Sequence, residues 1–254
     1  RDSLFEVDPY QDFDGSGFAS DLQGWGAERP ILTELIDEIQ PKLIIEVGSW
    51  KGASSIKMGL HIKTNRLNTK ILCVDTWLGS IEHWDKKDSQ DPELYLRYRS
   101  LRLKNGYPQL YYQFLYNVIA NKLQDVIIPF PNTSVMASKW LANHLIRADL
   151  IYIDASHDEA DAYRDISNYF DLLTERGIIF GDDYNEAYGV KRAVARFMVS
   201  HDVEFCHDNG VWVIRKANNH SNYLSRSLVR FKFFLYRMWF QLKKLIKWIL
   251  RWPA

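Results

Sequence analysis

Three aspartates in the second half of the chain lie at the ends of apolar runs, where α/β proteins place ligand-binding residues. Asp154 ends the apolar run 149–154, and Asp182 and Asp183 follow the apolar run 178–180. If both runs are neighbouring parallel strands, their carboxyl ends converge on the crevice where α/β sheets bind ligands. Crowded carboxylates repel one another unless a cation lies among them, and oxygen donors suit Mg²⁺, Mn²⁺ or Ca²⁺ better than zinc. Each aspartate also precedes a predicted helix, so a helix N-cap is the alternative role.

Two histidines lie near these segments. His157 is three residues past Asp154, and the intrinsic pKa of imidazole suits a general base near neutral pH. His83 lies beside Trp84 in a polar loop, where a solvated side chain is the simpler interpretation.

A glycine-punctuated turn follows an apolar run in the first half of the chain. Residues 43–55 read LIIEVGSWKGASS, and Gly48 and Gly52 bracket a tight turn in which the backbone can approach a ligand. No phosphate-binding GxGxxG or GxxxxGK[ST] pattern is present, and Glu46 would repel an anion but attract an ammonium group. A zwitterionic amino-acid nucleotide fits this polarity. The alternative is a glycine-rich bend that only packs a helix on a strand.

An acidic residue ends the next apolar run, 70–75. Asp75 lies where such folds recognise a ribose diol, although a solvated strand-end acid is the alternative. Thr76 and Trp77 follow, and they either flank the adenosine or simply pack. Small polar residues, including Ser134, follow the run 126–130 and suit the edge of an adenine.

These motifs resemble those of a known family. EVGSWKGAS is similar to the first motif of class I S-adenosylmethionine-dependent methyltransferases, with Trp50 in place of the usual glycine, as in the macrocin O-methyltransferase and cephalosporin-hydroxylase-like branch. DASHD and GIIFGDDY resemble the second half of cation-dependent O-methyltransferase sites. The resemblance covers roughly residues 30–216 and implies S-adenosylmethionine and a divalent cation, foremost Mg²⁺, as cofactors.

The resemblance also implies roles for individual residues. The metal ligands would be Asp154, Asp182 and Asp183, and the catalytic residues His157 and Asp154. The cofactor would be bound by Glu46, Gly48, Ser49, Trp50, Gly52, Asp75, Thr76, Trp77 and Ser134.

The elements that must position these residues alternate along the chain. Apolar runs predict strands, and apolar residues spaced three or four apart predict helices between them. Strands are expected at 43–47, 70–75, 126–130, 149–154 and 178–180, helices at 30–40, 54–60, 110–123, 137–146, 159–174 and 189–200, and a hairpin at 203–206 and 211–215. Gly177 would stop the helix 159–174. The prediction is a doubly wound, mostly parallel Rossmann-like α/β sheet with a C-terminal antiparallel hairpin.

Four segments organise the chain. With 254 residues, of which 46% are hydrophobic, it can form one α/β domain and an appendage. We expect an irregular arm at 1–29, a class I methyltransferase domain at 30–217 and a basic amphipathic helical tail at 218–254. Within the domain, 78–108 is long and aromatic, which predicts an inserted lid or substrate element.

Charge separates the tail from the rest of the chain. No acidic residue follows Asp208, whereas ten Lys or Arg lie between Arg215 and Arg251, so the remainder carries a net charge of −10. Charges interrupt the apolar stripe at 224–252, so the tail should not span a bilayer. It would lie on an anionic membrane surface, or dock on its own domain or on a second copy. No nucleic-acid partner is expected.

The cellular location follows from weaker signals. Cys73 and Cys206 lie in strand-like runs, which predicts buried reduced thiols in a cytoplasmic protein. No apolar segment typical of a signal peptide follows Arg1. The expected location is cytoplasmic, and peripheral to the membrane if the tail binds lipid.

The expected reaction is transfer of a methyl group from S-adenosylmethionine to a hydroxyl of a sugar, glycoside or other small molecule, assisted by a divalent metal. Two alternatives remain at this point. One is a hydroxylase on the same fold, and the other is a non-catalytic cofactor-binding scaffold whose partner is engaged by the tail.

Overall fold

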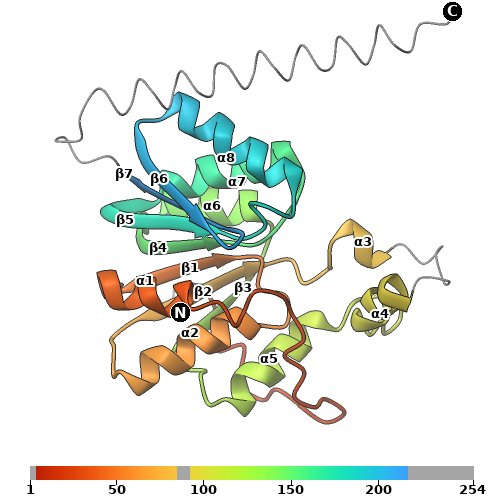
Figure 1. Cartoon of the computed structure of the whole chain (residues 1–254). Coiled ribbons are helices and arrows are strands. Elements are labelled where there is room, and N and C mark those ends of the chain that lie inside the picture. Colours follow the sequence, from red (N-terminus) through yellow and green to blue (C-terminus); the bar gives the residue numbers. More distant parts are fainter. Residues whose placement is uncertain (1–3, 85–91, 217–254) are drawn as a thin grey trace, which may run out of the picture.

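A single seven-stranded sheet organises the chain (Figure 1), whose computed structural model describes residues 4–84 and 92–216. The strand order is β3-β2-β1-β4-β5-β7-β6. The strands are β1 (Leu43–Val47), β2 (Lys70–Asp75), β3 (Ile127–Pro131), β4 (Ala148–Ile153), β5 (Leu173–Gly181), β6 (Val203–Asp208) and β7 (Val211–Lys216). Strands β1 to β5 pair in parallel, and β7 runs antiparallel between β5 and β6. The predicted mostly parallel sheet with a closing hairpin is confirmed.

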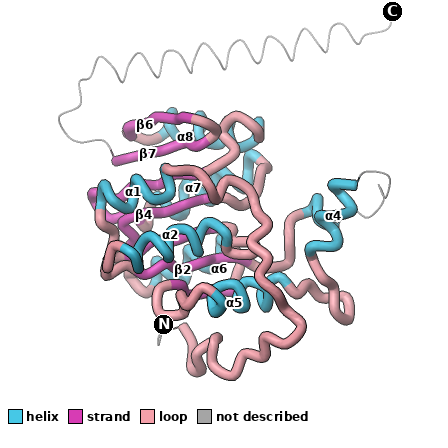
Figure 2. Tube along the Cα trace, turned by 60° about the horizontal axis from the view of Figure 1, so that its bottom comes forward, coloured by secondary structure: helices cyan, strands magenta, loops and turns pink. Residues whose placement is uncertain are grey.

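Helices cover both faces of the sheet (Figures 1 and 2). The described helices are α1 (Ile31–Ile39), α2 (Ala53–Thr64), α3 (Ile81–Trp84), α4 (Pro92–Ser100), α5 (Leu110–Ala120), α6 (Ser134–Asn143), α7 (Glu159–Phe170) and α8 (Tyr188–Ser200). Of these, α3 and α4 project beyond the sheet in Figure 1. Successive strand residues point to opposite faces, so Ile44 packs with α1, α2 and α5 while Ile45 packs with α6, α7 and α8. Two apolar layers therefore hold the sheet rigid between them.

The register of the parallel strands brings their carboxyl ends to one edge. Val47 of β1 pairs with Val74 of β2 on one side and with Ile153 of β4 on the other. Ile153 in turn pairs with Gly181 at the end of β5. The segments that follow these four strands, which include every predicted metal ligand, are consequently neighbours in space.

The predicted boundaries around Gly177 are wrong, since β5 begins at Leu173 and not at the expected residue 178. The helix expected over 159–174 ends at Phe170, and Gly177 lies inside β5 and does not stop a helix. A side chain at Gly177 would begin 3.2 Å from the Ala148 carbonyl oxygen and 2.8 Å from the Leu173 side chain. Gly177 is thus explained by close packing between strands, which local sequence does not reveal.

The remaining segments agree only in part with expectation. The arm contains no helix or strand between residues 4 and 30, as predicted. Cys206 is exposed rather than buried because β6 is the edge strand, whereas Cys73 is buried, and both thiols are free. Residues 85–91 of the expected lid and the tail at 218–254 lie outside the described residues, so the role of the tail stays a prediction. In the described part of the chain, no helix is long and apolar enough to cross a membrane.

Gly48 offers a test of the contact between the ends of β1 and β4. A Cβ at Gly48 would lie 1.9 Å from the Asp154 carbonyl oxygen, and Gly48 has a φ of +88°. We expect Gly48→Ala to lower the free energy of unfolding by about 3 kcal/mol or more, because backbone strain and overpacking add. Gly17→Ala is the control, since Gly17 has a φ of +81° and open space around it, and it should cost only about 1 kcal/mol. Equal losses in chemical denaturation would contradict the packing argument.

Candidate functional site

The glycine turn between β1 and α2 forms one wall of the site. Gly48, Trp50 and Gly52 all have positive φ, with values of +88°, +48° and +88°. Trp50 therefore adopts a left-handed conformation that a non-glycine residue rarely takes. Outside contacts must hold this turn in place.

Asp75 supplies the main contacts. Its Oδ2 accepts hydrogen bonds from the backbone N–H groups of Ser49 and Trp50, each 2.9 Å long, and its Oδ1 accepts one from the Trp77 N–H at 2.7 Å. Burial raises the pKa of Asp75, and these backbone hydrogen bonds oppose the shift. Asp75, the residue predicted to bind the ribose, thus lies directly beside the glycine turn and fixes the shape of that turn.

The two residues after Asp75 make different contacts. Trp77 is almost fully buried against Phe114, and its indole N–H donates to the Trp50 carbonyl at 2.8 Å. The Thr76 hydroxyl accepts from the Leu78 N–H at 3.2 Å. For Trp77 the structure favours packing over a role as the wall of a nucleoside pocket.

Glu46 is fully buried beneath the turn. Its two carboxylate oxygens accept hydrogen bonds from the hydroxyls of Ser54, at 2.5 Å, and Ser55, and the thiol of Cys73 approaches at 3.4 Å. Burial raises the pKa of Glu46, although the hydroxyl donors oppose this. The side chain joins β1 to the first turn of α2, and its predicted contact with a ligand ammonium stays a prediction.

Ser134 lies at the start of α6, after the end of β3. Its hydroxyl donates to Asp165 of α7 at 2.6 Å. The preceding Thr133 caps the helix by accepting from the Met136 N–H at 3.2 Å. The hydroxyl of Ser134 is thus already engaged with α7, and contact with an adenine edge stays a prediction.

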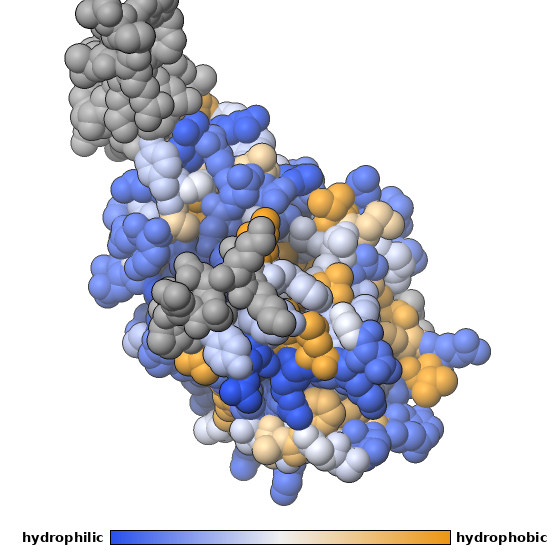
Figure 3. Space-filling view, turned by 90° about the vertical axis from the view of Figure 1, so that its right-hand side faces the viewer, coloured by the Kyte–Doolittle hydropathy of each residue, from blue (hydrophilic) through white to orange (hydrophobic). Residues whose placement is uncertain are grey.

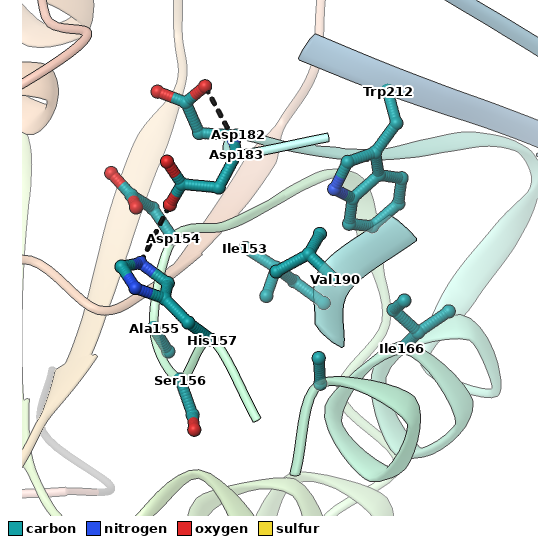
Figure 4. Close-up of a pocket in the computed structure, with 11 residues that line it drawn as sticks. Ile153, Asp154, Ala155, Ser156, His157, Ile166, Asp182, Asp183, Val190 and Trp212 are labelled. Atoms are coloured by element: carbon teal, nitrogen blue, oxygen red, sulfur yellow. Dashed lines mark hydrogen bonds and ion pairs between the residues drawn. The ribbon is translucent and has the colours of Figure 1, made fainter. Parts of the chain in front are cut away.

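The predicted acidic residues converge on one pocket (Figure 4). Asp154, Asp182 and Asp183 lie on one side of it with His157, and Trp212 lies on the other. His157 Nε2 is 2.8 Å from an oxygen of Asp183. The strand ends after β4 and β5 thus bring together the residues that were predicted to bind metal and to carry the proton.

Crowding changes the acidity of these groups. Burial, reinforced by the nearby charges of Asp182 and Asp183, raises the pKa of Asp154 to about 7. Burial also raises the pKa of Asp182, and the hydrogen bond to Asp183 raises the pKa of His157. The pKa values of neighbouring groups in one pocket are therefore raised, and Asp154 can exchange a proton near neutral pH.

The helix-cap alternative is wrong for all three aspartates. The N-cap of α7 is Asp158, whose side chain accepts from the N–H groups of Ala160 and Asp161. The N-cap residue of α8 is Ala187, which makes no side-chain cap. Asp154, Asp182 and Asp183 are consequently not explained by helix capping.

In the described residues, the acidic oxygens that lie close enough together to share a metal ion differ from the predicted set. Oxygens of Asp182, Asp183 and Glu186 lie within 4.8 Å of one another. Sequence reasoning missed Glu186, although its position four residues after Asp182 was a usable signal. Asp154 lines the same pocket as Asp182 and Asp183 and interacts with both through charge.

Residues from the arm approach the glycine turn. Lys51 is almost fully buried and forms an ion pair with Asp21 at 2.7 Å. The Trp50 indole N–H donates to Gln23 at 3.3 Å, and the ring centroid of Trp25 is 6.4 Å from that of Trp50. The arm therefore packs across the turn.

The short helix α3 reaches the same region. His83 is only 6% exposed, so the prediction of a solvated side chain is wrong, and its ring centroid lies 4.3 Å from that of Trp50. Glu82 approaches His157 at 3.8 Å. Figure 3 views this side of the molecule, where small hydrophobic areas are scattered among hydrophilic ones.

The fold and the glycine turn define a class I S-adenosylmethionine-dependent methyltransferase. A family model described as "Methyltransferase domain" matches residues 45–184. The match covers more than half of the chain, and the chain belongs to this family. A search of curated proteins gave no match.

Solved structures share the fold at low sequence identity. The O-methyltransferase NovP has a TM-score of 0.53 at 15% identity, covering 74% of this chain and 78% of that one. TomG from Streptomyces achromogenes, an O-methyltransferase in complex with SAM, has a TM-score of 0.52 at 14% identity, covering 78% and 83%. An O-methyltransferase from Bacillus cereus, in complex with SAH, has a TM-score of 0.51 at 14% identity, covering 78% and 84%.

The buried carboxylate of Glu46 leads to a stability test. Ser55→Ala removes a hydroxyl donor from a fully buried carboxylate, so we expect the free energy of unfolding to fall by about 1–3 kcal/mol. Ser138→Ala is the control, because that buried hydroxyl donates only to the Val135 carbonyl of its own helix and should cost less than about 1 kcal/mol. If the two variants unfold at the same denaturant concentration, Glu46 does not depend on Ser55.

Proposed function

We propose that this chain transfers the methyl group of S-adenosylmethionine to a hydroxyl oxygen of a small molecule. The observation that carries the proposal is the convergence of Asp154, Asp182, Asp183 and His157 on one pocket beside the glycine turn. A site that activates a hydroxyl needs a group to take its proton, and this pocket provides two. The O-methyltransferase names of NovP and TomG are in keeping with an oxygen acceptor.

The cofactor would lie along the glycine turn. Asp75 already accepts three backbone hydrogen bonds, which leaves about one of its four lone-pair positions for a ribose hydroxyl. Gly48 and Gly52 let the backbone approach the methionine end closely. The turn would thereby direct the sulfonium methyl toward the acidic pocket at the end of β4.

The chemical step moves a methyl group and a proton. The acceptor oxygen forms a bond to the methyl carbon as the carbon–sulfur bond breaks, leaving S-adenosylhomocysteine. His157 or Asp154 takes the hydroxyl proton. Burial raises the pKa of Asp154 to about 7, which suits a base near neutral pH, and the hydrogen bond to Asp183 raises the pKa of His157. Glu82 and Asp183 lie on either side of the His157 ring and hold its orientation.

A divalent cation fits the donor set of the pocket. Asp182, Asp183 and Glu186 offer carboxylate oxygens within 4.8 Å of one another, and Asp154 lies in the same pocket. Carboxylate oxygens are the donors that Mg²⁺ prefers. When bound, such an ion lowers the pKa of an acceptor hydroxyl and orients it. These four residues would hold the ion.

A sugar hydroxyl is the proposed acceptor. The hydroxylase and the scaffold remain the rivals, and one experiment separates all three. Purified protein is incubated with methyl-labelled S-adenosylmethionine and a panel of glycosides, with and without a chelator. We expect label on a glycoside oxygen, lost when the chelator is present.

The other outcomes of this experiment distinguish the proposed function from its rivals. Transfer that is indifferent to chelator and to Asp154→Asn removes the cation and Asp154 from the mechanism. Cofactor binding without turnover on any acceptor favours the scaffold. Oxygen insertion into an acceptor, with no label transferred, favours the hydroxylase.

Asp75 gives a separate test of cofactor binding. We expect Asp75→Asn to weaken S-adenosylmethionine binding about 10- to 100-fold, because the turn loses a carboxylate acceptor and the ribose loses a charge-assisted hydrogen bond. Asp149→Asn is the matched control. The Asp149 carboxylate likewise accepts backbone N–H groups, from Lys42 at 2.8 Å and Leu43 at 3.3 Å, but at the opposite edge of the sheet. Calorimetry that gives the same dissociation constant for both variants would remove Asp75 from the cofactor site.

A further inference from the structure

The N-terminal arm places a cation of its own in the acidic pocket. A guanidinium nitrogen of Arg29 lies 2.9 Å from Asp182 Oδ1, and Asp182 is only 5% exposed. The same guanidinium donates a hydrogen bond to the Asn209 carbonyl in the turn between β6 and β7. Arg29 is therefore held from two sides, unlike an arginine that moves freely on the surface.

The backbone of the arm is shaped around this contact. A Cβ at Gly26 would lie 2.4 Å from Asp182 Oδ2, so the chain passes directly over that carboxylate. The Arg29 N–H closes a turn by donating to the Gly26 carbonyl at 3.1 Å, and Lys57 of α2 donates to the Arg29 carbonyl at 3.0 Å. The turn at 26–29 thus holds the positively charged side chain of Arg29 beside Asp182.

Arg29 also lies close to a second acidic residue of the cluster. The position of a Cβ at Gly210 would be 2.9 Å from Arg29 Nη1 and 2.8 Å from Glu186 Oε2. Asp182 and Glu186 are two of the three residues whose oxygens lie within 4.8 Å of one another. The positive charge of Arg29 therefore already lies where a divalent cation would bind. A divalent cation bound to Asp182 would be repelled by this neighbouring guanidinium.

We propose that Arg29 is a built-in counterion of the acidic pocket and competes with a divalent cation for Asp182. Cation binding then requires the turn at 26–29 to leave Asp182, so the N-terminal arm sets the affinity of the pocket for metal. The inference rests on the cation in the proposed function, and it assigns a role to Arg29 and the turn at 26–29, which the proposed reaction itself does not use.

Binding of Mn²⁺ to the full chain tests the competition without measuring turnover. We expect Arg29→Gln to bind Mn²⁺ about tenfold or more tightly than the wild type by calorimetry or electron paramagnetic resonance, because a coupled competitor has been removed. Arg215→Gln is the matched control. Arg215 pairs with Glu38 at 2.8 Å and is 31% exposed, against 24% for Arg29, so it loses the same charge away from the pocket and should bind like the wild type.

Two further measurements keep the test decisive. Arg29→Lys retains the charge and should bind Mn²⁺ close to the wild-type affinity, even if Arg29→Gln proves unstable. In the wild type, saturating Mn²⁺ should speed amide hydrogen exchange at 26–29, because binding and release of the turn are linked.

Two results would overturn the proposal. If Arg29→Gln and the wild type bind Mn²⁺ equally, the competition is wrong while the metal site stands. If no variant binds Mn²⁺, the competition and the metal site fail together. Calorimetry with S-adenosylmethionine then shows separately whether the cofactor part of the proposed function survives.

Discussion

The close approach of Gly48 to the Asp154 carbonyl is the contact on which the site depends. Pairing continues one residue beyond the strands here, since the Gly48 N–H donates to Val74 at 2.9 Å and the Asp154 N–H donates to Val47 at 2.8 Å. A side chain at Gly48 would force β1 and β4 apart at the carboxyl edge. Because this contact is so short, the glycine turn and the acidic pocket share a wall. A methyl donor on one and an acceptor in the other would meet without a large movement of the sheet.

Five of the carboxylates near this edge are each stabilised differently. Hydroxyls bind Glu46 and backbone N–H groups bind Asp75, whereas Tyr152 donates to Asp154 at 3.1 Å. Asp182 and Asp183 are paired with the side chains of Arg29 and His157. Glu46, Asp75 and Asp154 have partners in α2, the glycine turn and β4, whereas Arg29 belongs to the arm and His157 to the loop after β4. The partners that a cation could displace are therefore those of Asp182 and Asp183, through movement of the arm or of the loop.

Much of the fold could be predicted because local patterns determine it. Apolar runs predicted all five parallel strands, and the glycine turn and the strand-end acids indicated the candidate site. Contacts between distant segments could not be read in this way: Arg29 and Asp182 pair across 153 positions of sequence. Gly177 resembled a helix stop because its real constraint, the Ala148 carbonyl, belongs to another strand. The contacts of Glu46 with two serine hydroxyls depend on how α2 starts, which the pattern alone left open.

Trp50 connects the glycine turn to two neighbouring segments, the arm and α3. A tryptophan at positive φ costs about 1–2 kcal/mol relative to glycine, so the turn would relax if glycine stood there. The strain is offset by contacts that glycine could not make, with the ring of His83 from α3 and the side chain of Gln23 from the arm. The Trp50 indole thereby joins the arm, α3 and the glycine turn. A ligand that reshapes the turn must also disturb the arm, and the arm carries Arg29 into the acidic pocket.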